Sequence, residues 1–326
     1  MKPTHIYQKK VFSLSQNEQP CTIYGGQAVI EGVMFAGLKT HVTAVRKKDN
    51  SIAYFEVPKK EIGWVQALKK IPFIRGIVGI VEASAKGAQH LNFSAETFAE
   101  EQGEEQTPKE EQKESFTGKI SMILGVAVVG VLSFLFGKFI FTLVPPTIEQ
   151  VLFGKLFVNQ IGHNLLEGLI KIVLLVAYIY FISLTPMIRR LFQYHGAEHK
   201  VISAYEAGVE LTVANVQKFS TLHYRCGSSF IVFTVLVGVI IYSFFTYDTF
   251  VERIVQRIIL LPVVIGVSYE VLRFTNLLRD IPVLRYLGYP GLWLQLLTTK
   301  QPDDSQVEVS IASFNRMLEL DKQARV

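Results

Sequence analysis

Cysteine and charge are both scarce in this 326-residue chain. It holds two cysteines, Cys21 and Cys226, which lie too far apart for a paired-thiol motif. This spacing excludes a disulfide framework and a four-cysteine zinc ribbon, so Cys226 can act only as a single thiol. Charged residues fill 19% of the positions, below the roughly 25% of an average soluble chain. Since hydrophobic residues fill 49%, the composition predicts a membrane protein.

Long apolar runs are missing from the first 118 residues and frequent after them. The N-terminus lacks the apolar core of a signal peptide, so we expect the first domain to stay on the side where it is made. A helix needs about 20 apolar residues to cross a bilayer. Segments 120–144, 172–188 and 227–247 are apolar enough to span, the second together with the apolar residues ahead of it. Segment 255–276 contains Arg257, Pro262 and Glu270, which leaves open whether it spans or re-enters.

The positions of lysine and arginine predict the orientation of these spans. Basic residues precede segment 120–144, fill the loop at 189–226 and follow segment 255–276. With four spans they all fall on one side of the membrane, which predicts cytoplasmic N- and C-termini. We therefore expect an α-helical polytopic membrane protein of the cytoplasmic membrane, with about four transmembrane helices and a small N-terminal α+β cytoplasmic domain.

The sequence predicts four regions in this order. Residues 1–94 form a β-rich cytoplasmic domain with an amphipathic helix, which packs on the strands or lies on the membrane surface. Residues 95–118 form an acidic disordered linker, 119–284 the four-span membrane domain with a cytoplasmic loop, and 285–326 a cytoplasmic C-terminal tail. We expect membrane lipids and possible protein partners of the N-terminal domain, and no specific nucleic acid, because the topology explains the basic balance. The oligomeric state stays open.

The stretch YHGAEHKVISAYEAG at 194–208 gives the strongest chemical signal. On a helix, His195 and His199 lie on one face, so both imidazoles can bind one ion while Glu198 acts as general base. The order His-x-x-Glu-His is that of the inverted zincins. A second pair of metal-binding residues, His223 and Cys226 in STLHYRCGSS, lies on the same predicted loop. The pattern predicts a divalent transition metal, Zn²⁺ above others.

Two ligand sets remain open at this point. The set His195, His199, His223 and Cys226 would close a tetrahedral structural site, whereas three of them with a water would make a catalytic site. Glu198 favours the catalytic set. In the plainest interpretation the histidines are hydrogen-bonding groups near lipid headgroups and bind no metal.

Two weaker signals lie elsewhere in the chain. Glu270 falls in an apolar segment, where a carboxylate is costly, so it either supplies a remote ligand or pairs with Arg273 or Arg257. The tripeptide at 25–27, Gly-Gly-Gln, matches the catalytic tripeptide of peptide-release factors, but it runs directly into a predicted strand. We therefore interpret it as a strand that begins with a tight turn.

Six motifs together resemble a known family. In chain order they are GGQAVIEGVMF, PFIRGIVGIVEA, YHGAEHKVISAYEAG, STLHYRCGSSF, PGLWLQLLTTKQP and EVSIASF. They are similar to the YqhQ-like family of bacterial membrane proteins, a domain of unknown function often labelled a predicted metal-dependent enzyme. The resemblance covers about residues 20–315 and implies no particular substrate.

These observations favour an integral membrane metalloprotein, a metal-dependent hydrolase with a zinc-like site at the cytoplasmic membrane face. Its substrate could be a lipid headgroup, a peptide bond near the membrane or a small amide. The alternative is a non-enzymatic membrane partner or scaffold for a translocation, assembly or ribosomal complex, with a structural metal or none.

Overall fold

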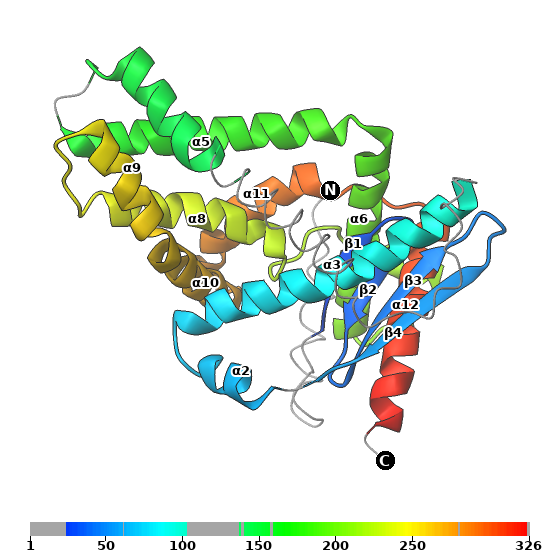
Figure 1. The fold of residues 1–326 in the computed structure, drawn as a ribbon. Coiled ribbons are helices and arrows are strands. Elements are labelled where there is room, and N and C mark those ends of the chain that lie inside the picture. The colour runs from blue at the N-terminus through cyan, green and yellow to red at the C-terminus, as the bar shows by residue number, and fades with distance from the viewer. Residues whose placement is uncertain are drawn as a thin grey trace, which may run out of the picture.

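A computed structural model describes residues 24–60, 62–102, 137, 140–156, 159–279 and 281–324. Its two parts are a four-stranded sheet with helices on both faces and a set of apolar helices beside it (Figure 1). Most of the predicted first span at 120–144 lies outside the described residues, as does the predicted linker after residue 102.

The sheet contains strands β1 (Gly25–Val29), β2 (Gly32–Ala36), β3 (Thr40–Arg46) and β4 (Ile52–Pro58). They pair in the order β1-β2-β3-β4, each antiparallel to the next. The β3–β4 turn has Asn50 at a positive φ of 64°, a conformation that asparagine adopts readily. All four strands therefore lie within residues 1–94, where β-branched and aromatic residues predict a β-rich domain.

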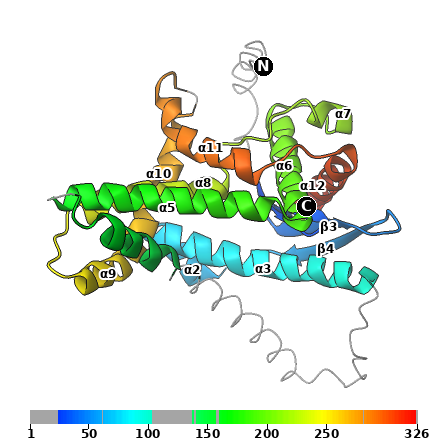
Figure 2. The same ribbon diagram turned by 90° about the horizontal axis from the view of Figure 1, so that it is seen from above.

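Helices cover both faces of this sheet (Figure 2). On one face lie α6 (Pro186–Glu206) and α12 (Asp304–Gln323), and Phe35 of β2 meets Phe314 of α12 in the fully buried core. On the other face lies α3 (Ile74–Gln102), where Phe93 stacks on Phe55 of β4. The sheet domain is thus assembled from segments far apart in the sequence.

The C-terminal segment and the linker correct two expected boundaries. Residues 304–323 do not form a tail, because α12 buries an apolar stripe against the sheet and the Asp321 carboxylate accepts hydrogen bonds from the backbone of Leu38 and Lys39. The predicted linker at 95–118 begins too early, because α3 continues to Gln102 and buries Thr97. Neither α12 nor the end of α3 contains a long apolar run, and for this reason the sequence predicts solvent-exposed segments there.

The apolar helices are Ile140–Phe153, α5 (Gln160–Ser183), α8 (Gly227–Tyr242), α9 (Phe250–Ile259), α10 (Leu261–Leu277) and α11 (Tyr289–Thr298). Short elements are α2 (Gly63–Leu68), α7 (Val213–Val216) and η1 (Leu284–Gly288). Among the described residues, α5 alone is long and apolar enough to cross a membrane, and α9 with α10 is a second candidate bent by 52°. The span expected at 172–188 is displaced, because Pro186 begins a new helix.

A buried network of ion pairs joins the helix Ile140–Phe153 to α5 and α9. Arg253 of α9 donates to Glu149 at 2.6 Å and to Glu167 of α5 at 2.7 Å. Arg257 also donates to Glu167 at 2.7 Å and to Asn164 at 2.7 Å. All four charged side chains are buried, so each carboxylate depends on the arginines for compensation.

Arg253→Met is expected to destabilise the protein by about 3–5 kcal/mol, because it leaves two buried carboxylates short of a partner. The measurement is thermal unfolding in detergent. The matched control is Arg316→Met, which removes an exposed ion pair with Glu56 on the sheet domain and should change the melting temperature little. Equal losses in the two variants would contradict the burial argument.

A second buried polar group lies between the sheet and α3. Thr43 Oγ1 and His90 Nδ1 are 2.6 Å apart, and the rings of His41 and His90 meet edge to face. Burial lowers the pKa of each histidine to about 4, and the charges of Lys86 and Lys59 also lower that of His41. Neither ring nitrogen of His41 has a hydrogen-bond partner within the part of the chain that the structure describes.

These two histidines should make the protein less stable in mild acid. An unfolded histidine titrates near 6.5, so the unfolded chain binds protons first and stability present above pH 6.5 falls towards pH 4. His41→Phe removes one titrating ring without losing a hydrogen bond, and should flatten the decrease of melting temperature over this range. An unchanged pH dependence would show that other groups cause it.

Candidate metal centre

The HGAEH segment lies in the middle of α6, between the sheet and the apolar helices. Its 3.6-residue period places His195 and His199 side by side, with ring centroids 4.5 Å apart. The intervening small residues serve packing. A Cβ on Gly196 would lie 2.1 Å from the Lys300 carbonyl oxygen, and Ala197 is fully buried in the core on the sheet. The two histidines are therefore held by close contacts on other sides of the helix.

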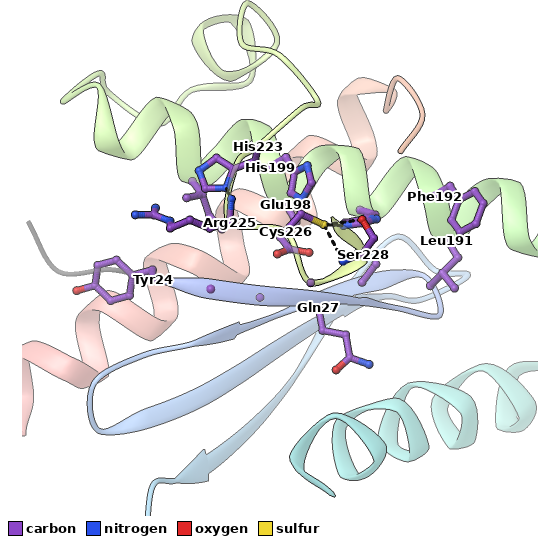
Figure 3. Close-up of a pocket in the computed structure, with 16 residues that line it drawn as sticks. Tyr24, Gln27, Leu191, Phe192, Glu198, His199, His223, Arg225, Cys226 and Ser228 are labelled. Carbon is purple, nitrogen blue, oxygen red and sulfur yellow. Dashed lines mark hydrogen bonds between the residues drawn. The ribbon is translucent and has the colours of Figure 1, made fainter. Parts of the chain in front are cut away.

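Cys226 approaches these histidines from the loop before α8. It is the N-cap of α8, where its Sγ accepts from the Ser228 backbone at 3.4 Å and lies 3.0 Å from Ser228 Oγ. His195 Nε2 is 3.2 Å from Sγ. One ligand atom from each of His195, His199 and Cys226 lies within 4.8 Å of the other two. Figure 3 shows His199 and Cys226 facing each other above β1.

The hydrogen bonds of the two rings determine their tautomers. His195 Nδ1 is 2.9 Å from the Thr298 carbonyl oxygen, and His199 Nδ1 is 2.5 Å from that of Thr221. A carbonyl oxygen only accepts, so both Nδ1 atoms are protonated and both Nε2 atoms carry lone pairs. His195 Nε2 lies 3.2 Å from Cys226 Sγ, and a ring nitrogen of His199 lies within 4.8 Å of the same sulfur. One thiol has a single proton, so it cannot donate to both nitrogens.

This donor set suits a metal ion. Two imidazole nitrogens and one sulfur converge, and each ring has its other nitrogen fixed by a carbonyl, as is usual for histidine ligands of zinc. Burial lowers the pKa of His199, which keeps the imidazole neutral and able to bind metal. These three residues could therefore hold a zinc-like ion.

Glu198 lies in the same pocket, against the first strand. It is almost fully buried, and burial raises the pKa of its carboxyl group, against smaller lowering effects of His195, His223 and the Gly26 backbone. A Cβ on Gly26 would lie 3.0 Å from the Glu198 side chain and 2.6 Å from the Met34 carbonyl oxygen. Glycine at this position thus allows the carboxyl group to reach the strand backbone.

The Gly-Gly-Gln tripeptide forms one wall of the pocket but does not present its glutamine to it. Figure 3 shows Gln27 pointing away from the pocket towards α3. Its amide lies where a Cβ on Gly87 would stand, 2.1 Å from that position. The strand interpretation therefore describes this segment, although no pattern in the sequence predicts the contact of Gly26 with Glu198.

The pocket has a volume of about 330 Å³ and mixed walls. Leu191 and Phe192 of α6 form an apolar part, and Phe192 also packs on the cluster that joins α5 to α11. Arg225 lines another part and is paired with Glu206 at the end of α6. A substrate with an apolar portion next to a polar group would match these walls.

His223 lies in the pocket but outside the three-residue cluster. Its backbone N–H and carbonyl are held by the Gln295 side chain at 2.9 and 2.8 Å, and its Nε2 lies 3.7 Å from Glu206 Oε2. Burial lowers its pKa to about 4, so the ring is neutral at physiological pH. The geometry therefore favours three protein ligands with Cys226 as the third.

Glu270 is remote from this site. Arg75 of α3 donates to it from Nε at 2.7 Å and again from Nη2, and the Phe73 backbone donates at 3.2 Å. The expectation that Glu270 supplies a ligand or pairs with Arg273 or Arg257 missed this partner. No local pattern identifies Arg75, because the pair joins residues 195 positions apart.

Gly196→Ala should distort the site. The added Cβ would overlap the Lys300 carbonyl, and such overpacking typically costs about 1–3 kcal/mol. We expect a lower melting temperature and weaker metal binding, both measured on the purified protein. Gly227→Ala is the matched control, because Gly227 lines the same pocket and a Cβ added there would meet open space. A normal Gly196→Ala protein would contradict the close approach of α6 to Lys300.

Comparisons with known proteins agree with one another. A family model described as "Protein of unknown function (DUF1385)" matches residues 71–320. The "Uncharacterized protein YqhQ" of Bacillus subtilis (strain 168) is 54% identical over 298 residues, covering 91% of this chain and 93% of that protein. No solved structure matches the chain.

Proposed function

This chain belongs to the DUF1385 family, and from the geometry of the site we propose that it is a membrane-embedded metal-dependent hydrolase. His195, His199 and Cys226 hold a zinc-like ion, and Glu198 is the general base. The resemblance seen in the six motifs is confirmed, and it leaves the activity to be inferred from the site.

One observation supports this proposal above the others. Two imidazole rings, each with Nδ1 held by a backbone carbonyl, lie beside one thiol: His195 Nε2 is 3.2 Å from Cys226 Sγ, and a ring nitrogen of the buried His199 lies within 4.8 Å of it. A purely structural hydrogen-bond network would leave one lone pair without a proton, which is costly in a buried site. A cation bound by both nitrogens and a thiolate removes that cost.

The chain's own residues would divide the reaction as follows. A bound zinc ion would polarise a substrate carbonyl or phosphoryl oxygen and lower the pKa of a water. Glu198 accepts the proton of the attacking water, and burial raises its pKa towards the working pH, which suits a general base. Three protein ligands leave a coordination position for substrate, as in catalytic zinc sites.

The placement in a membrane is supported by the surface of α5. Its candidate span is mostly exposed, with Leu165, Leu169, Val173 and Phe181 each more than half exposed. Soluble proteins rarely expose such a continuous apolar face. The metal cluster lies in the middle of α6, which follows α5 directly, and the first turns of α6 carry the basic residues Arg189 and Arg190. By the positive-inside rule this end, and both termini, are cytoplasmic.

The test is metal content and turnover of the purified, detergent-solubilised protein. Mass spectrometry should find close to one zinc or similar ion per chain, and a panel of esters, amides and phosphodiesters should include a substrate whose hydrolysis stops with chelator and returns with zinc. Protein prepared without chelators that contains no transition metal would contradict the proposal.

A second candidate rests on the 3.2 Å contact between His195 Nε2 and Cys226 Sγ at the N-terminus of α8. In this candidate Cys226 is a nucleophile and His195 its base, with Thr298 fixing the tautomer. Chelation separates the two candidates. Activity that survives complete metal removal but is lost on alkylation with iodoacetamide would favour the thiol mechanism.

A further inference from the structure

The segment that leads from the sheet into α3 exposes an unusual number of large apolar side chains. We call residues 62–81 the N-terminal hairpin; it contains α2, a turn and the first two turns of α3. Helix α2 has no buried residue, and Trp64 is 68% exposed. The exposed apolar residues of the hairpin are Ile62, Trp64, Ile71, Phe73, Ile74 and Val81.

The hairpin is fixed against α10, within the bent candidate span. Arg75 pairs with Glu270, and the Gly76 Cα lies so close to Tyr269 that a Cβ would be 2.5 Å from that side chain. Gly266 in turn lies against Phe73, with 2.9 Å between its Cβ position and the Phe73 carbonyl oxygen. Figure 1 shows the start of α3 beside α10.

These contacts place the tip of the hairpin beside the middle of α10, far from the C-terminal end of that helix. Gly266 precedes the end of α10 at Leu277 by 11 residues, which is about 16 Å at the helical rise of 1.5 Å per residue. The neighbouring surface of α10 is also apolar, since Val263, Phe274 and Leu277 are exposed. The hairpin therefore continues the apolar surface of α10, which with α9 forms the second candidate span.

We propose that the N-terminal hairpin is inserted into the cytoplasmic leaflet, with lipid acyl chains covering its exposed apolar side chains. This inference rests on the membrane placement proposed above. Two of its three charges are compensated, because Arg75 pairs with Glu270 and Lys69 pairs with Glu82, while the third, Lys70, is exposed and can extend to the headgroups. Lys59 and Lys60 precede the hairpin, where they suit anionic headgroups, and Trp64 suits the interface.

The two native tryptophans allow a direct test on the full chain. Trp293→Phe leaves Trp64 as the sole tryptophan, and the protein is reconstituted in nanodiscs of phosphatidylcholine and phosphatidylglycerol. Brominated acyl chains should quench Trp64 emission strongly, whereas aqueous iodide should quench it weakly. Two reference proteins lack both native tryptophans and carry either Tyr178→Trp on α5 or Tyr54→Trp on β4, at side chains that are 54% and 44% exposed.

The reference proteins distinguish a failure of the hairpin inference from a failure of the proposed membrane placement. The Tyr178→Trp protein should be quenched by brominated lipid and the Tyr54→Trp protein by iodide. Failure of lipid to quench the Tyr178→Trp protein would overturn the membrane placement itself. If lipid quenches that protein but iodide quenches Trp64, the hairpin lies in water. If neither quencher reaches Trp64, protein covers it, and the inference is again wrong.

Discussion

His199→Ala is expected to remove the metal from the purified protein. His199 supplies one of three converging ligand atoms, and its Nδ1 is fixed by the Thr221 carbonyl. Loss of an outer-shell partner typically costs 10–100-fold in metal affinity, so loss of a ligand should cost more than about 100-fold. The measurement is zinc affinity by competition with a chromophoric chelator, together with metal content by mass spectrometry.

His223→Ala is the matched control for this variant, because it removes a buried histidine of the same pocket that is not in the cluster. It should keep most of the metal. Equal loss in both variants would show that four protein ligands close the site, and would favour a structural metal. A wild-type protein without metal would instead favour the scaffold alternative, which a co-purifying complex unaffected by loss of His195, His199 and Cys226 would support.

Glu198→Gln is expected to keep the metal and lose the activity. The amide preserves the size of the side chain but cannot accept a proton from water, so turnover should fall by about 10²–10⁴-fold. The measurement is the initial rate on whichever substrate the hydrolase panel identifies, with metal content determined on the same sample. A variant that keeps its activity while His199→Ala loses it would assign the metal a structural role.

The same carboxyl group predicts the acid side of the pH profile. Glu198 must be deprotonated to act as a base, and burial raises its pKa above the ordinary value of 4.5. The wild-type rate should therefore begin to fall at a higher pH than for an exposed glutamate as the solution is acidified. An acid limb at or below pH 4.5 would indicate that another group is the base.

The sequence predicted the core of the site because the helical period alone brings His195, Glu198 and His199 together. It also predicted that Cys226 would lie near them. It could not choose between His223 and Cys226, since that choice depends on Gln295 holding the His223 backbone from another helix. The contact of Gly26 with Glu198 likewise depends on how β1 packs on α6.

The boundaries of the helices were harder to predict than their existence. Segment 172–188 was expected to end at 188, but Thr185 and Pro186 start a new helix there and shift the apolar helix to Gln160–Ser183. The fourth segment is divided at Leu260 into two helices. The role of α12 was missed because its apolar residues recur at helical spacing without forming a long run, and their partners are on β2 and β3.

X-ray absorption at the zinc edge tests the central claim most directly, because it reports the ligand atoms themselves. For zinc-loaded wild-type protein, the account predicts one sulfur at about 2.3 Å and two imidazole nitrogens at about 2.0–2.1 Å, with a further light-atom ligand. Cys226→Ser should remove the sulfur contribution. A wild-type spectrum with no sulfur ligand, or with an unchanged sulfur contribution in Cys226→Ser, would contradict the proposed metal centre.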